Sequence, residues 1–243
     1  MKKALLLSAA LLMAATTLSA QSAEDIVRRM DASQTFDTLY VEGSMTTVDR
    51  FGEKSSSYNS WSRGSSDFLI EFTNVEERGQ KVLRVGDELF LFYPDAEDII
   101  PMHGAALKQS LFGDVSYEDI TEDKDTLSQY DVKLLGTETL DGTECWVIEM
   151  IAVSRDVPYP KQIIKVGQED EVLRAAEYYA RSGRLLKTVT VNEIERFDDG
   201  RYVITKMVME DQLRRGSSTE MVVKDVKIDP PLDEALFSFD ALF

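Results

Sequence analysis

Most of this chain alternates apolar and polar residues with a period of two, which is the pattern of half-buried β-strands. Turn-forming pairs separate the strands, at Gly86-Asp87, Asp141-Gly142, Ser182-Gly183 and Asp199-Gly200. Strands are predicted at 39–48, 58–63, 67–73, 80–86 and 87–94, then two across 130–153 and about five more up to residue 228. This order predicts one domain that is mainly β, with a highly curved antiparallel sheet.

Helical patterns are few and short. In AEDIVRRM (23–30), Ile26, Val27 and Met30 share one helical face, and two acidic residues precede them at the end where the helix dipole favours negative charge. This predicts one amphipathic helix near the N-terminus. Only one other stretch, beginning near Met102, has helical character. A large curved sheet therefore has little helix available to cover it.

The first 20 residues predict a cleaved secretory signal peptide. Lys2 and Lys3 precede an apolar run that is too short for a membrane span, and small residues follow it. Cleavage is expected after Ala20, with Ala23 as the alternative, and no cysteine lies directly after the apolar run to accept a lipid anchor. The domain is therefore expected to span residues 21–243 and to be soluble in the periplasm.

The charge balance argues against anionic partners. The net charge is −17, so electrostatic steering disfavours nucleic acid and favours cationic molecules, although an acidic surface also simply keeps an exported protein soluble. Cys145 is the only cysteine, so no intramolecular disulfide can form. Its apolar strand predicts a buried free thiol in a monomer.

Several predicted strands carry large, flexible apolar side chains. Each of them taken singly is an ordinary core residue, but together they exceed what two short helices can cover. We therefore predict a partly covered apolar groove lined by Met45, Leu69, Phe90, Phe92, Met150, Met207 and Met209.

Residues 101–113 are predicted to form a short helix that lies across this groove. Leu107 and Leu111 share one face, Phe112 adjoins them, and Gly113 suits the position after a helix end. A helix this short is only marginally stable alone. It would either act as a lid over the groove or form a fixed plug, and the pattern does not distinguish the two.

Three ordered motifs resemble the outer-membrane lipoprotein-sorting protein family, the LolA-like group. The first is LFLFYPDAEDIIPMHGAALKQSLFGDVSYEDI (89–120), the second is VPYPKQIIKV (157–166), and the third is AAEYYARSGRLLKTV (175–189). The resemblance covers most of residues 25–240. It implies an incomplete β-barrel covered by short helices, with a cavity that holds acyl chains.

The resemblance also implies a function. Known members carry lipoproteins across the periplasm, which implies acyl chains as ligand, an inner-membrane transporter as donor and an outer-membrane acceptor. Transfer would make and break no bonds, and no cofactor or metal is expected. The alternative is a sensor of the same fold, which would use its cavity to detect lipids or lipoproteins and to regulate a partner protein.

Other readings of the sequence are weaker. His103 is the only histidine and is expected at the surface, which disfavours histidine-based catalysis or zinc binding. The ending ALFSFDALF has the aromatic spacing of an outer-membrane strand, but the prolines before it favour a tail packed on the sheet. Residues 117–119 and 159–161 are expected to be structural, with partner docking as the alternative.

Overall fold

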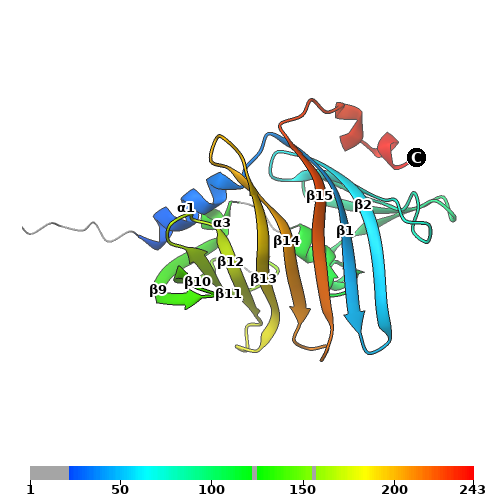
Figure 1. The fold of residues 1–243 in the computed structure, drawn as a ribbon. Helices are drawn as coiled ribbons and strands as arrows, with labels where there is room; N and C mark the ends of the chain where they lie inside the picture. Colours follow the sequence, from blue (N-terminus) through cyan, green and yellow to red (C-terminus); the bar gives the residue numbers. More distant parts are fainter. Residues whose placement is uncertain (1–21, 122–124, 155–156) are drawn as a thin grey trace, which may run out of the picture.

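The computed structural model describes residues 22–121, 125–154 and 157–243. The predicted signal peptide lies outside them. One antiparallel sheet of 13 strands dominates the fold, in the order β6-β5-β4-β3-β2-β1-β15-β14-β13-β12-β11-β10-β9. Figure 1 shows its curvature, and the sheet is not closed because β6 and β9 are its two edges. The predicted mainly β fold with an incomplete barrel is confirmed.

The strands are longer and more numerous than the sequence pattern indicates. The first half of the sheet contains β1 (Thr38–Asp49), β2 (Gly52–Arg63), β3 (Asp67–Phe72), β4 (Lys81–Val85), β5 (Glu88–Tyr93) and β6 (Asp98–Met102). The second half contains β9 (Tyr130–Leu140), β10 (Thr143–Ala152), β11 (Lys161–Gly167), β12 (Leu173–Tyr179), β13 (Leu185–Arg196), β14 (Tyr202–Asp211) and β15 (Ser218–Ile228). Each half is a succession of neighbouring hairpins, and the pairing of β1 with β15 joins them.

The hairpin turns lie where the sequence predicts them. Asp141 and Gly142 both have positive φ, at 47° and 83°, between β9 and β10. Gly86, Gly183 and Gly200 also have positive φ in their turns. Glycine adopts this conformation without the steric cost that a Cβ imposes, so these residues set the turn positions.

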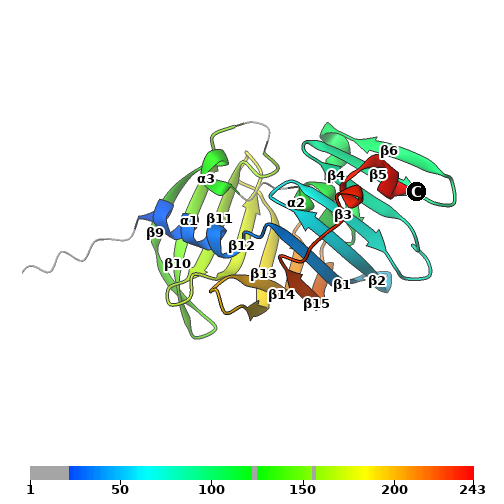
Figure 2. The ribbon, with the colours of Figure 1, turned by 90° about the horizontal axis from the view of Figure 1, so that it is seen from above.

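Helix α1 (Ala23–Ser33) confirms the predicted N-terminal helix. The side chain of Ser22 caps it by accepting a hydrogen bond from the amide of Asp25 at 3.1 Å. Ile26, Val27 and Met30 are buried against the concave face of β10 to β14, in a cluster with Ile148, Met150, Ile164, Val166, Ala176, Val189, Val191 and Met209. Figure 2 shows α1 inside the curve of the sheet, together with the four-residue helix α3 (Thr126–Gln129). Cys145, on β10, is a fully buried free thiol.

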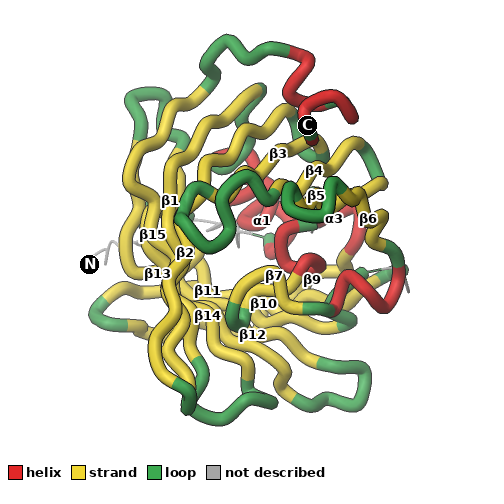
Figure 3. Tube along the Cα trace, turned by 90° about the vertical axis from the view of Figure 1, so that its right-hand side faces the viewer, coloured by secondary structure: helices red, strands yellow, loops and turns green. Residues whose placement is uncertain are grey.

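The predicted helix over 101–113 is wrong. Pro101 pairs with Phe90 inside β6, and only Gly104–Lys108 is helical, as the 3₁₀-helix η1. Next come the hairpin strands β7 (Ser110–Phe112) and β8 (Val115–Ser116), and then helix α2 (Tyr117–Ile120). Gly113 has a φ of 56° and forms the hairpin turn, where the sequence predicts the end of a helix. We call residues 104–120 the inner segment, because they pack inside the curved sheet (Figure 3).

A second layer covers the convex face of β3 to β5. Leu69, Leu83, Phe90, Phe92 and Leu242 form an outer cluster beneath the C-terminal 3₁₀-helices η2 (Glu234–Phe237) and η3 (Phe239–Leu242). The rings of Phe239 and Phe90 meet edge to face, with centroids 4.5 Å apart. The prediction that the tail packs on the sheet is therefore confirmed.

Replacing Leu242 with alanine should lower the free energy of unfolding by about 2–4 kcal/mol, because the side chain is fully buried in the outer cluster. The measurement is urea denaturation followed by tryptophan fluorescence. Leu213→Ala is the control: Leu213 is 48% exposed on a hairpin tip, so its loss should change stability by about 0.5 kcal/mol or less. Equal effects of the two substitutions would show that the tail does not stabilise the sheet.

Candidate functional site

The concave face holds an apolar pocket of about 410 Å³ between the sheet and the inner segment. Volumes of roughly 300–1,000 Å³ are typical of small-molecule sites. The sheet supplies most of its apolar wall, and Leu111 and Ile120 of the inner segment supply the rest. The apolar lining from the sheet is Leu39, Val41, Met45, Phe68, Ile70, Val203, Ile204, Met207, Met221 and Val223.

The polar lining of the pocket comes mainly from β2 and the turn after it. Tyr58, Ser60 and Ser62 alternate along β2 and face the pocket, and exposed Gly64 and Ser65 connect it to solvent. Asp67 is the only charged residue among the described lining residues. Partial burial raises its pKa, but hydrogen bonds from Arg63 at 2.6 Å and from the Gly86 amide at 2.9 Å outweigh burial. The pKa of Asp67 is therefore lowered, and the carboxylate is ionised at neutral pH.

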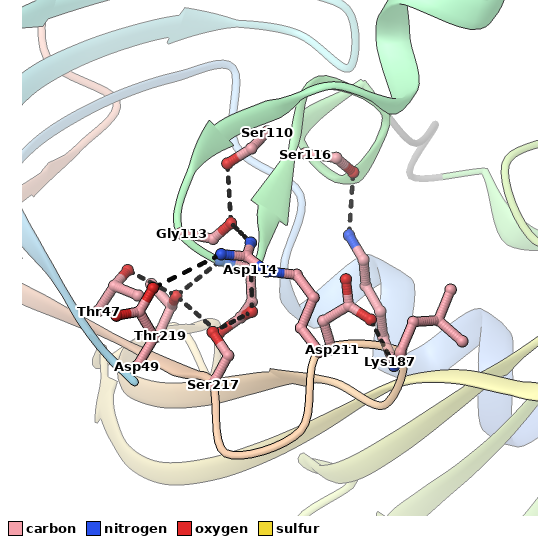
Figure 4. A network of polar contacts seen from close by, with 12 residues as sticks. Thr47, Asp49, Ser110, Gly113, Asp114, Ser116, Lys187, Asp211, Ser217 and Thr219 are labelled. Carbon is pink, nitrogen blue, oxygen red and sulfur yellow. Dashed lines mark hydrogen bonds and ion pairs between the residues drawn. The ribbon is translucent and has the colours of Figure 1, made fainter. Parts of the chain in front are cut away.

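One polar network fixes the hairpin of the inner segment to the sheet (Figure 4). Buried Asp114 accepts hydrogen bonds from Ser217 at 2.7 Å and Thr219 at 3.1 Å, and its amide donates to the Thr219 hydroxyl at 2.8 Å. That hydroxyl also bonds the hydroxyl of Thr47 at 2.8 Å, on β1. The hairpin turn is thereby held against the junction of β1 and β15.

A second network fixes the C-terminal end of the inner segment. Asp119 accepts hydrogen bonds from the amide and hydroxyl of Ser116, both at 2.7 Å, and from the hydroxyl of Tyr159. It also forms an ion pair with Lys187, whose side chain is only 11% exposed. Lys187 donates a further hydrogen bond to Ser116 at 3.0 Å. Burial and the adjacent Asp119 carboxylate both raise the pKa of Tyr159, so its hydroxyl stays a hydrogen-bond donor.

All three motifs that carry the family resemblance contribute to this second network. Ser116 and Asp119 come from the first motif, Tyr159 from the second and Lys187 from the third. Asp119 and Tyr159 have a structural role here, which agrees with the favoured expectation for residues 117–119 and 159–161. Lys187 was missed, although a lysine within an alternating apolar strand is the signal that could have indicated it.

The structure separates the predicted groove residues into several places. Met45, Met207 and Leu111 line the pocket. Phe112 is buried beside Met45, and Leu107 packs against the same cluster. Met150 and Met209 pack in the cluster under α1. Leu69, Phe90 and Phe92 belong to the outer cluster, so they lie on the opposite face of the sheet and do not line this pocket.

Catalytic and metal-binding groups do not gather at the pocket. His103 is exposed before η1 and does not line the pocket. Within residues 22–121, 125–154 and 157–243, no three His, Cys, Asp or Glu side chains are grouped so that they could hold a metal ion. None of the helices in the described part of the chain has the length and apolar character that a membrane crossing requires. What the pocket can do is bury an apolar ligand.

Comparisons with known proteins agree with this fold. A family model described as "uncharacterized protein" matches residues 64–242. The crystal structure of a DUF1329 family protein from Desulfovibrio piger is 26% identical, with a TM-score of 0.83 over 91% of this chain and 98% of that one. A LolA superfamily protein from Nitrosomonas europaea is 28% identical, with a TM-score of 0.76 over 90% and 99% of the two chains.

A third structure extends the agreement in fold. It is a putative outer membrane lipoprotein-sorting protein domain from Vibrio parahaemolyticus, 21% identical, with a TM-score of 0.80 over 91% of this chain and 97% of that one. No curated protein matches the sequence significantly.

Proposed function

We propose, because this chain belongs to the outer-membrane lipoprotein-sorting (LolA-like) family, that it is a periplasmic carrier for the acyl chains of lipoproteins or lipids. The observation that supports this most directly is the apolar pocket on the concave face, which connects to solvent beside Gly64 and Ser65. Its walls are flexible methionines and branched aliphatic residues, which adapt to a chain without fixed shape. The carrier would shelter the chain and deliver it towards the outer membrane, with no covalent chemistry.

Burial of hydrocarbon supplies the binding energy in this proposal. A chain of about 16 carbons gains roughly 0.8 kcal/mol per buried methylene, or about 12 kcal/mol if all of it is covered. The ordering of the chain offsets part of that gain. Release into water would then be slow, so the carrier would hand its ligand directly to another apolar site. This requirement fits an inner-membrane transporter as donor and an outer-membrane protein as acceptor.

The proposal includes export. Residues 1–20 would be the signal peptide, and residues 21–243 would form the single mature domain in the periplasm, acting as a monomer. N-terminal sequencing of the exported protein tests this, and an N-terminus at Gln21 is expected. A mature protein that retains Lys2 and Lys3 would contradict it.

Filling the pocket should weaken binding. Met221 lies on the pocket wall and is partly buried, so Met221→Trp should lower the affinity for the neutral dye N-phenyl-1-naphthylamine roughly tenfold, about 1.4 kcal/mol. Fluorescence titration measures the affinity. Leu213→Trp, on an exposed hairpin tip, is the matched control and should leave the affinity unchanged.

Two further measurements separate a carrier from other outcomes. Native mass spectrometry of protein purified after export should show a bound lipid or acylated protein by its mass. When the ligand-bound protein is mixed with lipid vesicles, the ligand should transfer to the vesicles. A ligand that stays bound but changes the affinity for a partner protein would indicate a sensor, and wild-type protein that binds neither dye nor lipid would exclude both functions.

A further inference from the structure

The hydroxyl group of Tyr58 has no hydrogen-bond partner among the described residues, and water can reach its oxygen from the pocket. The residue is 8% exposed and lines the pocket from β2. Its ring lies over Gly43 on the neighbouring strand β1, where a Cβ atom would be 2.7 Å from the hydroxyl oxygen. Burial raises the pKa of Tyr58 to about 12, so the group remains a neutral donor at physiological pH.

In the empty protein water can bind the Tyr58 hydroxyl, so the group costs the fold little. A ligand that fills the pocket displaces this water, and a polar group that is then left without a hydrogen bond costs free energy. A ligand that accepts the hydrogen bond of Tyr58 avoids that cost, whereas a ligand without an acceptor does not.

Other features of the lining define the acceptor. Ser60 and Ser62 continue the row of hydroxyls along the same face of β2. The described lining has no lysine or arginine, and its only charge is the ionised Asp67. A carboxylate inside this pocket would be unpaired and repelled, whereas the carbonyl of an ester or amide accepts hydrogen bonds and carries no charge.

We propose that Tyr58 donates a hydrogen bond to an ester or amide carbonyl of the bound acyl ligand, and that the pocket selects neutral acyl esters and amides over free fatty acids. This inference rests on the proposed carrier function and specifies its ligand class. The row of hydroxyls on β2 gives the ligand polar contacts along a pocket that is otherwise apolar. Gly43 is required for the site, because any side chain there would displace the Tyr58 ring.

The test compares three ligands with equal hydrocarbon chains. Monopalmitoylglycerol has an ester carbonyl, O-hexadecylglycerol lacks it, and palmitate at pH 8 is a carboxylate. Each ligand is titrated into wild-type protein and into Tyr58→Phe with N-phenyl-1-naphthylamine bound, and the displacement of the dye measures the affinity of the ligand. Tyr40→Phe is the control, because Tyr40 does not line the pocket and its hydroxyl contacts Asn59 at 3.4 Å.

Wild-type protein and Tyr40→Phe should prefer the ester to the ether by about three- to tenfold, the size of one hydrogen bond. Tyr58→Phe should remove that preference and keep the melting temperature of the wild type. An unchanged preference in Tyr58→Phe, no preference in wild-type protein, or palmitate binding as tight as that of the ester would each overturn the inference. Equal binding of ester and ether leaves the carrier function standing, whereas failure of all three ligands to displace the dye would refute that function as well.

Discussion

Gly113→Ala is expected to lower the free energy of unfolding by about 2–5 kcal/mol. Gly113 has a φ of 56°, where an L-residue costs about 1–2 kcal/mol. An added Cβ would lie 1.8 Å from the Thr47 hydroxyl oxygen and 2.3 Å from that of Thr219. Both hydroxyls are buried in the network that holds Asp114, so the methyl group would force overpacking, which costs a further 1–3 kcal/mol or more.

Gly86→Ala is the matched control for this prediction. Gly86 has a φ of 59° in the turn between β4 and β5, but an added Cβ there meets nothing within 4 Å. Gly86→Ala should therefore lower the free energy of unfolding by only about 1–2 kcal/mol, the cost of a positive φ for an L-residue. Thermal and urea denaturation of both variants measure the difference. Equal losses would show that the hairpin turn is not wedged between β1 and β15, and would favour a mobile lid.

Asp119→Ala is expected to cost about 3–5 kcal/mol, because it leaves the Lys187 ammonium buried without its counter-ion. The hydroxyl of Tyr159 would also lose its acceptor. The hairpin turn and the C-terminal end of the inner segment are each held by a polar network, so this variant should loosen the segment over the pocket as well as destabilise the fold. Urea denaturation and the dissociation rate of a bound dye measure the two effects.

A double variant tests whether the loss of stability comes from the unpaired charge of Lys187, and a surface variant serves as the control. In Asp119→Ala/Lys187→Met the unpaired charge is gone, so the double variant should be more stable than Asp119→Ala. Glu220→Ala is the control, since Glu220 pairs with Lys206 at 2.9 Å on the surface, where both side chains are at least 32% exposed. It should change stability by about 1 kcal/mol or less. If Asp119→Ala lowers the free energy of unfolding no more than Glu220→Ala does, the network does not hold the inner segment.

The sequence predicts well the structural features that depend on residues close together in the chain. The turns at Gly86, Asp141-Gly142 and Gly200 depend on backbone conformations that two residues encode, and the apolar face of α1 repeats within three turns. With those local features known, the antiparallel order of each half of the sheet follows, because consecutive strands joined by short turns pair.

Which face of a strand lines the pocket is not local information. Leu89, Leu91, Phe90 and Phe92 are all apolar, so alternation gives no signal on β5. The leucines face inward, and the two phenylalanines lie in the outer cluster because the C-terminal tail, about 150 residues later, covers that side. The inner segment misled prediction for a similar reason: its long-range contacts to β13 and β15 override a weak helical pattern.

The pairing of β1 with β15 has a consequence for the order of events during biogenesis. Leu39 lies opposite Ile228, and the pocket is built from β1 to β3 on one side of this pairing and from β14 and β15 on the other. A chain that emerges from its N-terminus can form early hairpins locally, but β1 must wait for the last strand, and closing so long a loop is entropically slow. The pocket is therefore completed only when β15 pairs with β1, and a chain that ends before β15 lacks the strand that joins the two sides of the pocket.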